Sequence, residues 1–178
     1  MGDDVEELEA VAPIDLLRRA EVRVVVASRE ARKLICGRNG IKLEADVLLD
    51  EVASERFDCV IVPGGPGTAA MREDARVLEL LRDHAAAGRK VAAICAAPLV
   101  LAEAGLLEKR RYTGHASIAM ELPALADQAV VVDGEVLTSR GAGTGVHFGL
   151  ALVEALVDAE TARSVAAAIH STDALRSW

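Results

Sequence analysis

The sequence predicts an α/β fold with a mainly parallel β-sheet that is covered by helices on both faces. Short apolar segments rich in Val and Ile alternate with segments of helical periodicity along the chain. The composition, 52% hydrophobic and 27% charged over 178 residues, supplies enough apolar side chains to bury a sheet on both sides. We therefore expect one domain that spans residues 1–178.

The first part of the chain is predicted to begin with a helix. Val5 to Arg19 carries apolar residues at helical spacing, around a Pro13 that would end or kink the first turns. Val22 to Ala27 is short and β-branched, which favours a strand. Residues 35–49 are ambiguous, and a turn at residues 37–40 would join two short strands. The next expected elements are a strand at 57–62 and a helix at 75–87.

The second part is predicted to alternate strands and helices around a cysteine. The apolar strand Val91 to Ile94 runs directly into Cys95 and a helix from Ala96 to Ala104. Asp133-Gly134 is a hairpin turn between strands at 129–132 and 135–138. The other expected elements are a strand at 111–113, a helix at 146–157 and a shorter helix at 160–168.

The start of the chain is unusual for this fold class. An open α/β domain usually begins with a buried central strand, whereas an acidic segment leads directly into a helix here. Either the sheet lacks its N-terminal strand or the start of the chain is misassigned.

Composition excludes several classes of function. The formal net charge of −8 and the absence of a dense Lys/Arg stripe argue against nucleic acid as a partner. The longest uncharged stretches fall short of the ~20 apolar residues that a membrane span needs. The acidic N-terminus does not resemble a secretory signal, so the expected location is the cytoplasm. Cys36, Cys59 and Cys95 form no CxxC pair, which indicates neither a disulfide framework nor a metal site.

Cys95 is the strongest candidate for chemistry. A residue between a parallel strand and a helix lies on a sharp turn at the carboxyl edge of the sheet, where ligands of open α/β folds bind. The N–H groups at the start of the helix would favour thiolate over thiol. The small neighbours Ala93, Ala96 and Ala97 permit a tight turn, as in a nucleophile elbow. The alternative is an inert structural cysteine.

Other residues at this edge could complete a site. The run Gly64-Gly65-Pro66-Gly67 follows the preceding strand, so its N–H groups could hold an oxyanion, or it could be an ordinary turn. It matches neither the GxxxxGK[ST] nor the GxGxxG nucleotide-binding pattern. Glu9, near the head of the first helix, could face the sheet edge or solvent. Gly141 to Thr144 is typical of a helix-capping turn.

The four histidines are candidates for a base beside the cysteine. His115 follows the strand expected at 111–113 and could reach the shared edge. His84 and His170 are predicted at the surface, and His147 as a cap or interface residue. The sequence predicts Cys59 in the core and Cys36 exposed or at an interface.

Four ordered blocks resemble the ThiJ/PfpI superfamily, in particular the branch of the Parkinson-disease protein deglycase and its bacterial homologues. The blocks extend over nearly the whole chain, from Leu8 to Ala20, Val62 to Gly65, Ala92 to Pro98 and Leu137 to Thr144. The resemblance implies a flavodoxin-like three-layer sandwich that forms a homodimer. It also implies that the strand normally preceding the Glu9 loop is missing here.

The resemblance assigns roles to particular residues. Cys95 would be the nucleophile and an oxidation-sensitive thiol, and Glu9 a protonated carboxyl that hydrogen-bonds it. The amides of Gly65 and Ala96 would bind an oxyanion. The family's assisting histidine falls on Leu122 here, which leaves the nearby His115 as the possible base.

The resemblance also implies what the protein does. The first hypothesis is a cofactor-free glyoxalase or deglycase, in which Cys95 adds to a small α-oxoaldehyde such as methylglyoxal or to glycated protein and nucleotide adducts. The alternative is a redox-responsive stress protein or chaperone that uses an oxidisable Cys95 without turnover. A third possibility is a member that folds but catalyses nothing.

Overall fold

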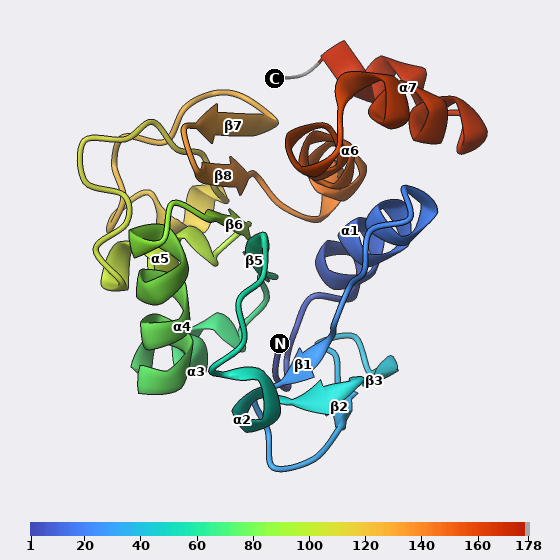
Figure 1. Cartoon of the computed structure of the whole chain (residues 1–178). Helices are drawn as coiled ribbons and strands as arrows, with labels where there is room; N and C mark the ends of the chain where they lie inside the picture. Colours follow the sequence, from blue (N-terminus) through green and yellow to red (C-terminus); the bar gives the residue numbers. More distant parts are fainter. Residues whose placement is uncertain (177–178) are drawn as a thin grey trace.

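A four-stranded sheet forms the centre of the fold in a computed structural model, which describes residues 1–176 (Figure 1). The last two residues of the expected domain lie outside the described residues. The strand order is β5-β6-β8-β7, in which β5, β6 and β8 are parallel and β7 is antiparallel to β8. These strands are β5 (Cys59–Val62), β6 (Lys90–Ile94), β7 (Val130–Asp133) and β8 (Val136–Ser139).

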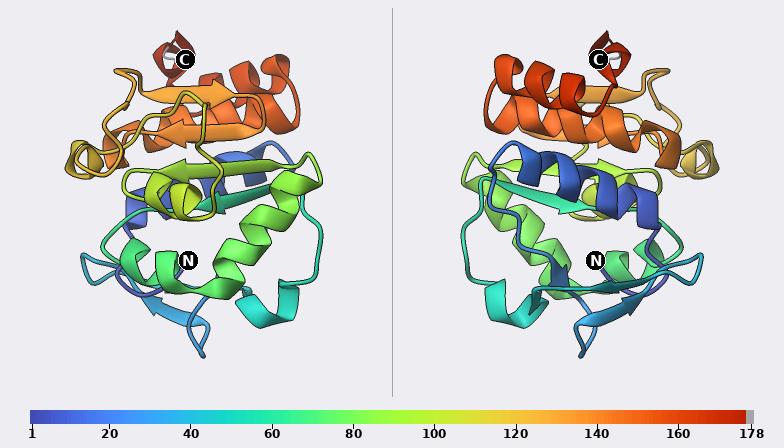
Figure 2. Two further views of the ribbon diagram at one scale, coloured as in Figure 1. Left: turned by 90° about the vertical axis from the view of Figure 1, so that its left-hand side faces the viewer. Right: turned by 90° about the vertical axis from the view of Figure 1, so that its right-hand side faces the viewer.

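Helices cover both faces of this sheet (Figure 2). One layer contains α1 (Glu7–Arg19), α6 (Gly145–Leu156) and α7 (Ala159–Ala168). The other layer contains α3 (Thr68–Glu73), α4 (Ala75–Ala86) and α5 (Pro98–Glu103). Short 3-10 turns are η1 (Ala116–Ile118), η2 (Ala142–Thr144) and η3 (Thr172–Arg176). The expected three-layer α/β architecture with a mainly parallel sheet is confirmed.

Strand β6 connects the two cores because its side chains alternate between them. Ala92 and Ile94 pack into the cluster with α1 and α6, whereas Val91 and Ala93 pack into the cluster with α4 and α5. All four residues are fully buried, as expected for a central parallel strand. This burial holds the turn after Ile94 in a fixed position.

The N-terminal region differs in part from the prediction. Two short pairs lie beside the main sheet: β1 (Ala27–Ser28) with β4 (Val47–Leu48) in parallel, and β2 (Leu34–Cys36) with β3 (Lys42–Glu44) as the expected hairpin. A single turn, α2 (Leu49–Val52), follows β4. The strand predicted at Val22–Ala27 is only partly formed, since residues 22–26 join no strand. The adjacent edge of β5 has no strand partner among residues 1–176.

Three local predictions need correction. Pro13 does not end the first helix, which continues unbroken from Glu7 to Arg19. Residues 111–113 form no strand, and only Tyr112 makes an isolated bridge, with Leu125. The helix after Cys95 begins at Pro98, because Ala96 and Ala97 belong to the turn itself. Within residues 1–176, every helix is too short or too polar to cross a bilayer.

Candidate active site

Cys95 lies at the end of β6 in a conformation that side chains rarely adopt. Its φ is +66°, in the left-handed region that disfavours residues with a Cβ. Two backbone hydrogen bonds hold it there: its N–H donates to Ser139 O at 2.9 Å, and His115 N–H donates to its carbonyl at 2.8 Å. Strained residues of this kind cluster at functional sites. The half-buried thiol therefore has the geometry of a nucleophile elbow.

Two backbone amides point toward the sulfur. The N–H groups of Gly65 and Ala96 both hydrogen-bond Cys95 Sγ and act to lower the pKa of the thiol. Gly65 adopts a φ of +101° in the turn after β5, and β5 ends at the same sheet edge as its parallel neighbour β6. A negative charge on sulfur, or on an atom bonded to it, meets two donors there.

Glu9 brings a buried carboxyl to this edge from the first turn of α1. It is 1% exposed, and its N–H donates to Glu6 Oε2 at 2.9 Å in the cap of the helix. Burial raises the pKa of Glu9 to about 7, and the nearby Glu6 charge adds to the rise. The Cys95 thiol and the N–H groups of Gly64 and Ala142 act in the opposite direction. Glu9 therefore exchanges a proton near neutral pH.

The contacts of two glycines show how closely the side chains converge. A Cβ on Gly141 would lie 3.7 Å from Glu9 Oε1, 3.7 Å from His115 Cδ2 and 3.8 Å from Cys95 Sγ. A Cβ on Gly64 would overlap Glu9 Oε2 and come within 2.7 Å of Cys95 Cβ. Glu9, Cys95 and His115, from three different elements, thus surround one point beside Gly141.

The ionisation of Cys95 differs from the sequence expectation. Burial, and then the charge of Glu9, raise the pKa of the thiol to about 12. The start of α5 does not offset this, because that helix begins three residues later, at Pro98. A protonated Glu9 would remove the repulsion and donate a hydrogen bond to the sulfur. The two groups therefore titrate as one coupled pair.

His115 lies on the rim of a groove of about 460 Å³. Ser117 N–H donates to its Nδ1 at 3.2 Å, and Ser117 Oγ lies 2.8 Å from the same atom. Because Nδ1 accepts, the neutral ring carries its proton on Nε2. The groove is lined by Gly114, His115, Ala116, Arg140, Gly141, Ala142, Gly143 and Thr144.

Leu122, on which the resemblance places the position of the family's assisting histidine, is not among the residues that converge beside Gly141. Leu122 packs against the apolar cluster between the sheet, α4 and α5. His115 instead reaches the site, since its backbone N–H is anchored on the Cys95 carbonyl.

The other histidines and cysteines lie away from this point. The prediction that His84 lies at the surface is wrong, since its side chain is fully buried. Both ring nitrogens have partners there: Phe57 N–H donates to Nε2, and Leu80 O lies 2.7 Å from Nδ1. His170 is exposed as predicted, and His147 lies half-buried in the first turn of α6. Cys36 is exposed, as one of the predicted alternatives stated, and Cys59 is half-buried on β5.

Sequence reasoning named Gly64 and Gly141 only as members of glycine-rich turns, and it missed Gly114. A Cβ on Gly114 would lie 2.8 Å from Ile118 Cδ1 and 3.0 Å from Cys95 O. The loop of Gly141 is held by Thr144, whose Oγ1 accepts from Gly141 N–H at 3.1 Å. The sequence signal that points to Gly64 and Gly141 is their position in glycine-rich runs that follow strands.

No group of three or more metal-ligating side chains occurs among residues 1–176. The chemistry that the described side chains offer is that of a thiol, a carboxyl with a raised pKa, an imidazole and oriented amides. This set suits nucleophilic addition to a carbonyl with proton transfer.

Known proteins share this sequence and fold. The profile of the DJ-1/PfpI family matches residues 1–155. The chain is 37% identical over 171 residues to Protein dj-1beta of Drosophila melanogaster, covering 93% of this chain and 91% of that protein. It is 33% identical over 167 residues to "Glutathione-independent glyoxalase DJR-1.2" of Caenorhabditis elegans, covering 92% and 89%. The solved structure "Toxoplasma gondii DJ-1, oxidized" superposes with a TM-score of 0.91 at 35% identity, covering 94% of each chain. The chain therefore belongs to the DJ-1/PfpI family.

Proposed function

We propose that the protein is a cofactor-independent glyoxalase that converts methylglyoxal, or a similar small α-oxoaldehyde, into a hydroxy acid. The observation that carries this proposal is the convergence of Cys95 Sγ, Glu9 Oε1 and His115 beside Gly141. A relative named as a glutathione-independent glyoxalase supports it at the level of the family.

In the first step, Cys95 would add to the aldehyde carbon of the substrate. The thiol passes its proton to the Glu9 carboxylate, whose pKa of about 7 suits both acceptance and return of a proton at neutral pH. The sulfur lone pair forms the bond to the aldehyde carbon, and the carbonyl electron pair moves to oxygen. The N–H groups of Gly65 and Ala96 stabilise that oxyanion until Glu9 returns the proton. The product is a hemithioacetal.

The second step would move a proton between the two substrate carbons. Glu9 takes the proton from the former aldehyde carbon, which leaves an enediolate, and returns it to the former ketone carbon. The hydroxyl proton on the former aldehyde carbon passes to the former ketone oxygen, so that a carbonyl forms next to the sulfur. The Nε2–H of His115 donates a hydrogen bond to the ketone oxygen during this transfer. A thioester of lactate on Cys95 results, and water hydrolyses it to lactate and the free thiol. The sum is methylglyoxal plus water giving lactate and a proton.

The same residues could act as a deglycase. In a glycated amine, the carbon that was the aldehyde carbon of methylglyoxal carries a hydroxyl group and the nitrogen of the amine. Cys95 would displace the amine, which leaves with the proton held by Glu9, and the later steps are unchanged. Glycated protein and nucleotide adducts therefore belong to the proposed substrate class.

Lactate formation from methylglyoxal without added glutathione tests the proposal. Because serine is a much weaker nucleophile, we expect Cys95→Ser to lower the rate by about a thousandfold or more. Cys36→Ser is the matched control, since Cys36 is exposed and away from the groove, and it should keep the wild-type rate. Comparable rates for Cys95→Ser and wild type, both folded by circular dichroism, would refute the proposal.

A redox-responsive role is the second candidate, and one observation favours it. The amides of Gly65 and Ala96 and a protonated Glu9 are donors to the Cys95 sulfur, so they would also hold the oxygens of a sulfinate. Two equivalents of peroxide supply those oxygens. We expect intact-mass and peptide analysis after mild peroxide to place two added oxygens on Cys95. Oxidation of Cys36 with Cys95 left reduced would contradict this role.

Assembly and location stay predictions. The exposed apolar residues Leu8 and Val11 lie on α1, in the segment from Leu8 to Arg19 that the family resemblance places near the homodimer interface. Neither nucleic acid nor a membrane is proposed as a partner.

A further inference from the structure

Thr144 precedes helix α6 but does not cap it. Residues 141–144 are predicted as a helix-capping turn, in which a threonine hydroxyl accepts an N–H group of the helix that follows. The structure places Thr144 at the N-cap position of α6, yet its side chain makes no hydrogen bond to that helix. The prediction is therefore wrong for the Thr144 hydroxyl, which is free to bond elsewhere.

The Thr144 hydroxyl instead holds the loop before the helix. Gly141 N–H donates to Thr144 Oγ1 at 3.1 Å, while Thr144 N–H donates to Gly141 O at 2.8 Å. Thr144 Oγ1 also lies 2.7 Å from Ser139 Oγ. Because the Ser139 hydroxyl donates to Ala129 O at 2.9 Å, the hydrogen between the two hydroxyls comes from Thr144. A chain of hydrogen bonds thus runs from Gly141 through both hydroxyls to the end of β7.

The same residues connect this loop to the cysteine. Ser139 is fully buried at the end of β8, and its carbonyl accepts the Cys95 N–H at 2.9 Å. A Cβ on Gly141 would lie 3.7 Å from Glu9 Oε1 and 3.8 Å from Cys95 Sγ. The loop that the hydroxyls hold is therefore one wall of the site, in contact with both reacting groups.

The Glu9 carboxyl has few donors to stabilise its charge. Its Oε2 is buried and has no hydrogen-bond partner within residues 1–176. The Cys95 thiol and the N–H groups of Gly64 and Ala142 act to lower its pKa against the effect of burial. Ala142 belongs to the loop that Thr144 holds, so a displacement of this loop would remove one of these donors.

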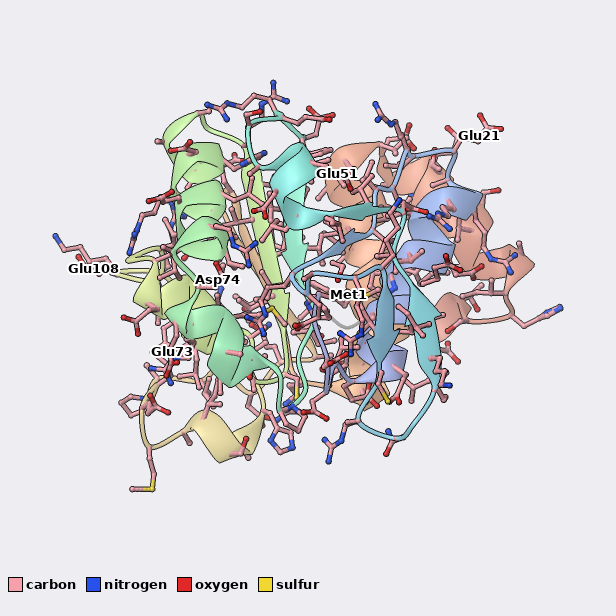
Figure 3. All side chains as sticks on the ribbon, turned by 90° about the horizontal axis from the view of Figure 1, so that it is seen from below. Met1, Glu21, Glu51, Glu73, Asp74 and Glu108 are labelled. Atoms are coloured by element: carbon pink, nitrogen blue, oxygen red, sulfur yellow. The ribbon has the colours of Figure 1, made fainter. Side chains whose placement is uncertain are left out.

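Three titratable groups face this carboxyl from different elements. Glu6 lies in the cap of α1, Cys95 follows β6, and His115 lies across the point beside the loop. Within residues 1–176, none of the three is a hydrogen-bond partner of the threonine hydroxyl. Glu21, beyond the far end of α1, lies at the outer edge of the molecule (Figure 3). A change at the threonine hydroxyl therefore reaches Glu9 through the loop.

We propose that Thr144 is a positioning residue for the acid–base group of the site. Its hydroxyl, together with that of Ser139, keeps the loop of Gly141 against Glu9, so that the Ala142 N–H stays directed at the carboxyl. The role of Glu9 as proton carrier rests on the proposed function, whereas the titration of its carboxyl does not. A merely structural Thr144 would stabilise the fold and leave that titration unchanged.

NMR titration of Glu9 in the whole chain tests the proposal. The glutamates are labelled with ¹³C at the carboxyl carbon, and loss of one signal in Glu9→Gln identifies the Glu9 carboxyl. Thr144→Val removes the hydroxyl and keeps the shape of the side chain. Because the carboxylate then loses the Ala142 N–H, the pKa of Glu9 should rise. We expect the midpoint to move upward from about 7 by about 0.5 to 1 pH unit.

Three further variants separate this role from general stability. Thr144→Ser keeps the hydroxyl and should keep the wild-type midpoint. Thr161→Val is the matched control, because Thr161 is also half-buried at the start of a helix, α7, where its hydroxyl bonds Asp158. We expect this control to lower Tm and to leave the Glu9 midpoint unchanged. Ser139→Ala breaks the same chain of hydrogen bonds and should raise the midpoint, as Thr144→Val does.

An unchanged midpoint in Thr144→Val and Ser139→Ala, both folded by circular dichroism, would overturn the proposal, as would an equal shift in Thr161→Val. If Thr144→Val does not fold, Ser139→Ala decides alone. Lactate formation is measured separately, and kcat/KM at pH 7 should fall about tenfold in Thr144→Val and return in Thr144→Ser. A shifted midpoint in a protein whose wild type forms no lactate would refute the proposed function and support the positioning role.

Discussion

Replacing Glu9 with glutamine is expected to slow turnover strongly and to make the folded protein more stable than the wild type at high pH, relative to the difference at low pH. The amide keeps the shape of the side chain but cannot accept the proton that the thiol and substrate release. Loss of a general acid–base group lowers rates by about 10²- to 10⁴-fold. We therefore expect lactate formation to fall by that factor in Glu9→Gln.

The stability effect follows from the raised pKa. Glu9 has a pKa of about 7 in the folded protein against an ordinary value of 4.5, so between these pH values the folded state holds a proton that the unfolded state has released. Stability contributed by the neutral carboxyl is complete below pH 4.5 and is lost as the pH rises toward 7. Glutamine has no such loss. The stability of Glu9→Gln relative to wild type should increase by about 2 to 3 kcal/mol between pH 5 and pH 8.

Urea unfolding at the two pH values measures this change, and any constant packing difference cancels. Asp15→Asn is the matched control, because Asp15 lies on the same helix and is about half exposed in an ion pair with Arg19. A stability difference for Glu9→Gln that is independent of pH would show that Glu9 is ionised in the folded protein throughout, contrary to the account.

Gly64→Ala is expected to disrupt the site by steric overlap. The added Cβ would overlap Glu9 Oε2 and lie 2.7 Å from Cys95 Cβ and 2.8 Å from Ile94 O. Because a backbone atom and the elbow itself are involved, the overlap must displace the Cys95 turn. Overpacking of this kind costs about 1–3 kcal/mol of stability, and a displacement near 1 Å can lower rates about a hundredfold.

Gly143→Ala provides the control for Gly64→Ala. Gly143 lies on the groove, but a Cβ there would meet no atom within 4 Å. We expect the free energy of unfolding of Gly143→Ala to differ from that of the wild type by less than about 0.5 kcal/mol. If Gly64→Ala has the stability and lactate-forming rate of Gly143→Ala, then Glu9 and Cys95 are not held as closely as described.

Local patterns were sufficient to predict most of the elements. The hairpin at residues 37–40, the strand before Cys95 and the helices of the C-terminal part follow from turn residues and apolar periodicity. Residues 22–26 are as β-branched as any strand, yet they form none, because strand formation requires a neighbouring strand to pair with. Propensity describes single residues, so it could not show that no strand among residues 1–176 pairs with this segment.

The site was predicted less completely than the fold. The position of Cys95 follows from the strand–turn–helix pattern, whereas the resemblance assigned Glu9 and the amides of Gly65 and Ala96. The burial of His84 and the approach of His115 depend on tertiary contacts, namely the Phe57 N–H and the Cys95 carbonyl. The raised pKa of Cys95 also has a tertiary cause, since burial and Glu9 outweigh the two amides.

The most direct test of the central claim is to trap the covalent intermediate during turnover. The wild-type chain is mixed with methylglyoxal without glutathione, acid-quenched at short times and analysed by intact mass and peptide mapping. We expect a substrate adduct on Cys95 that forms before lactate and disappears as substrate is consumed. Lactate formed while Cys95 never carries an adduct, with the same rate in Cys95→Ser, would contradict the account.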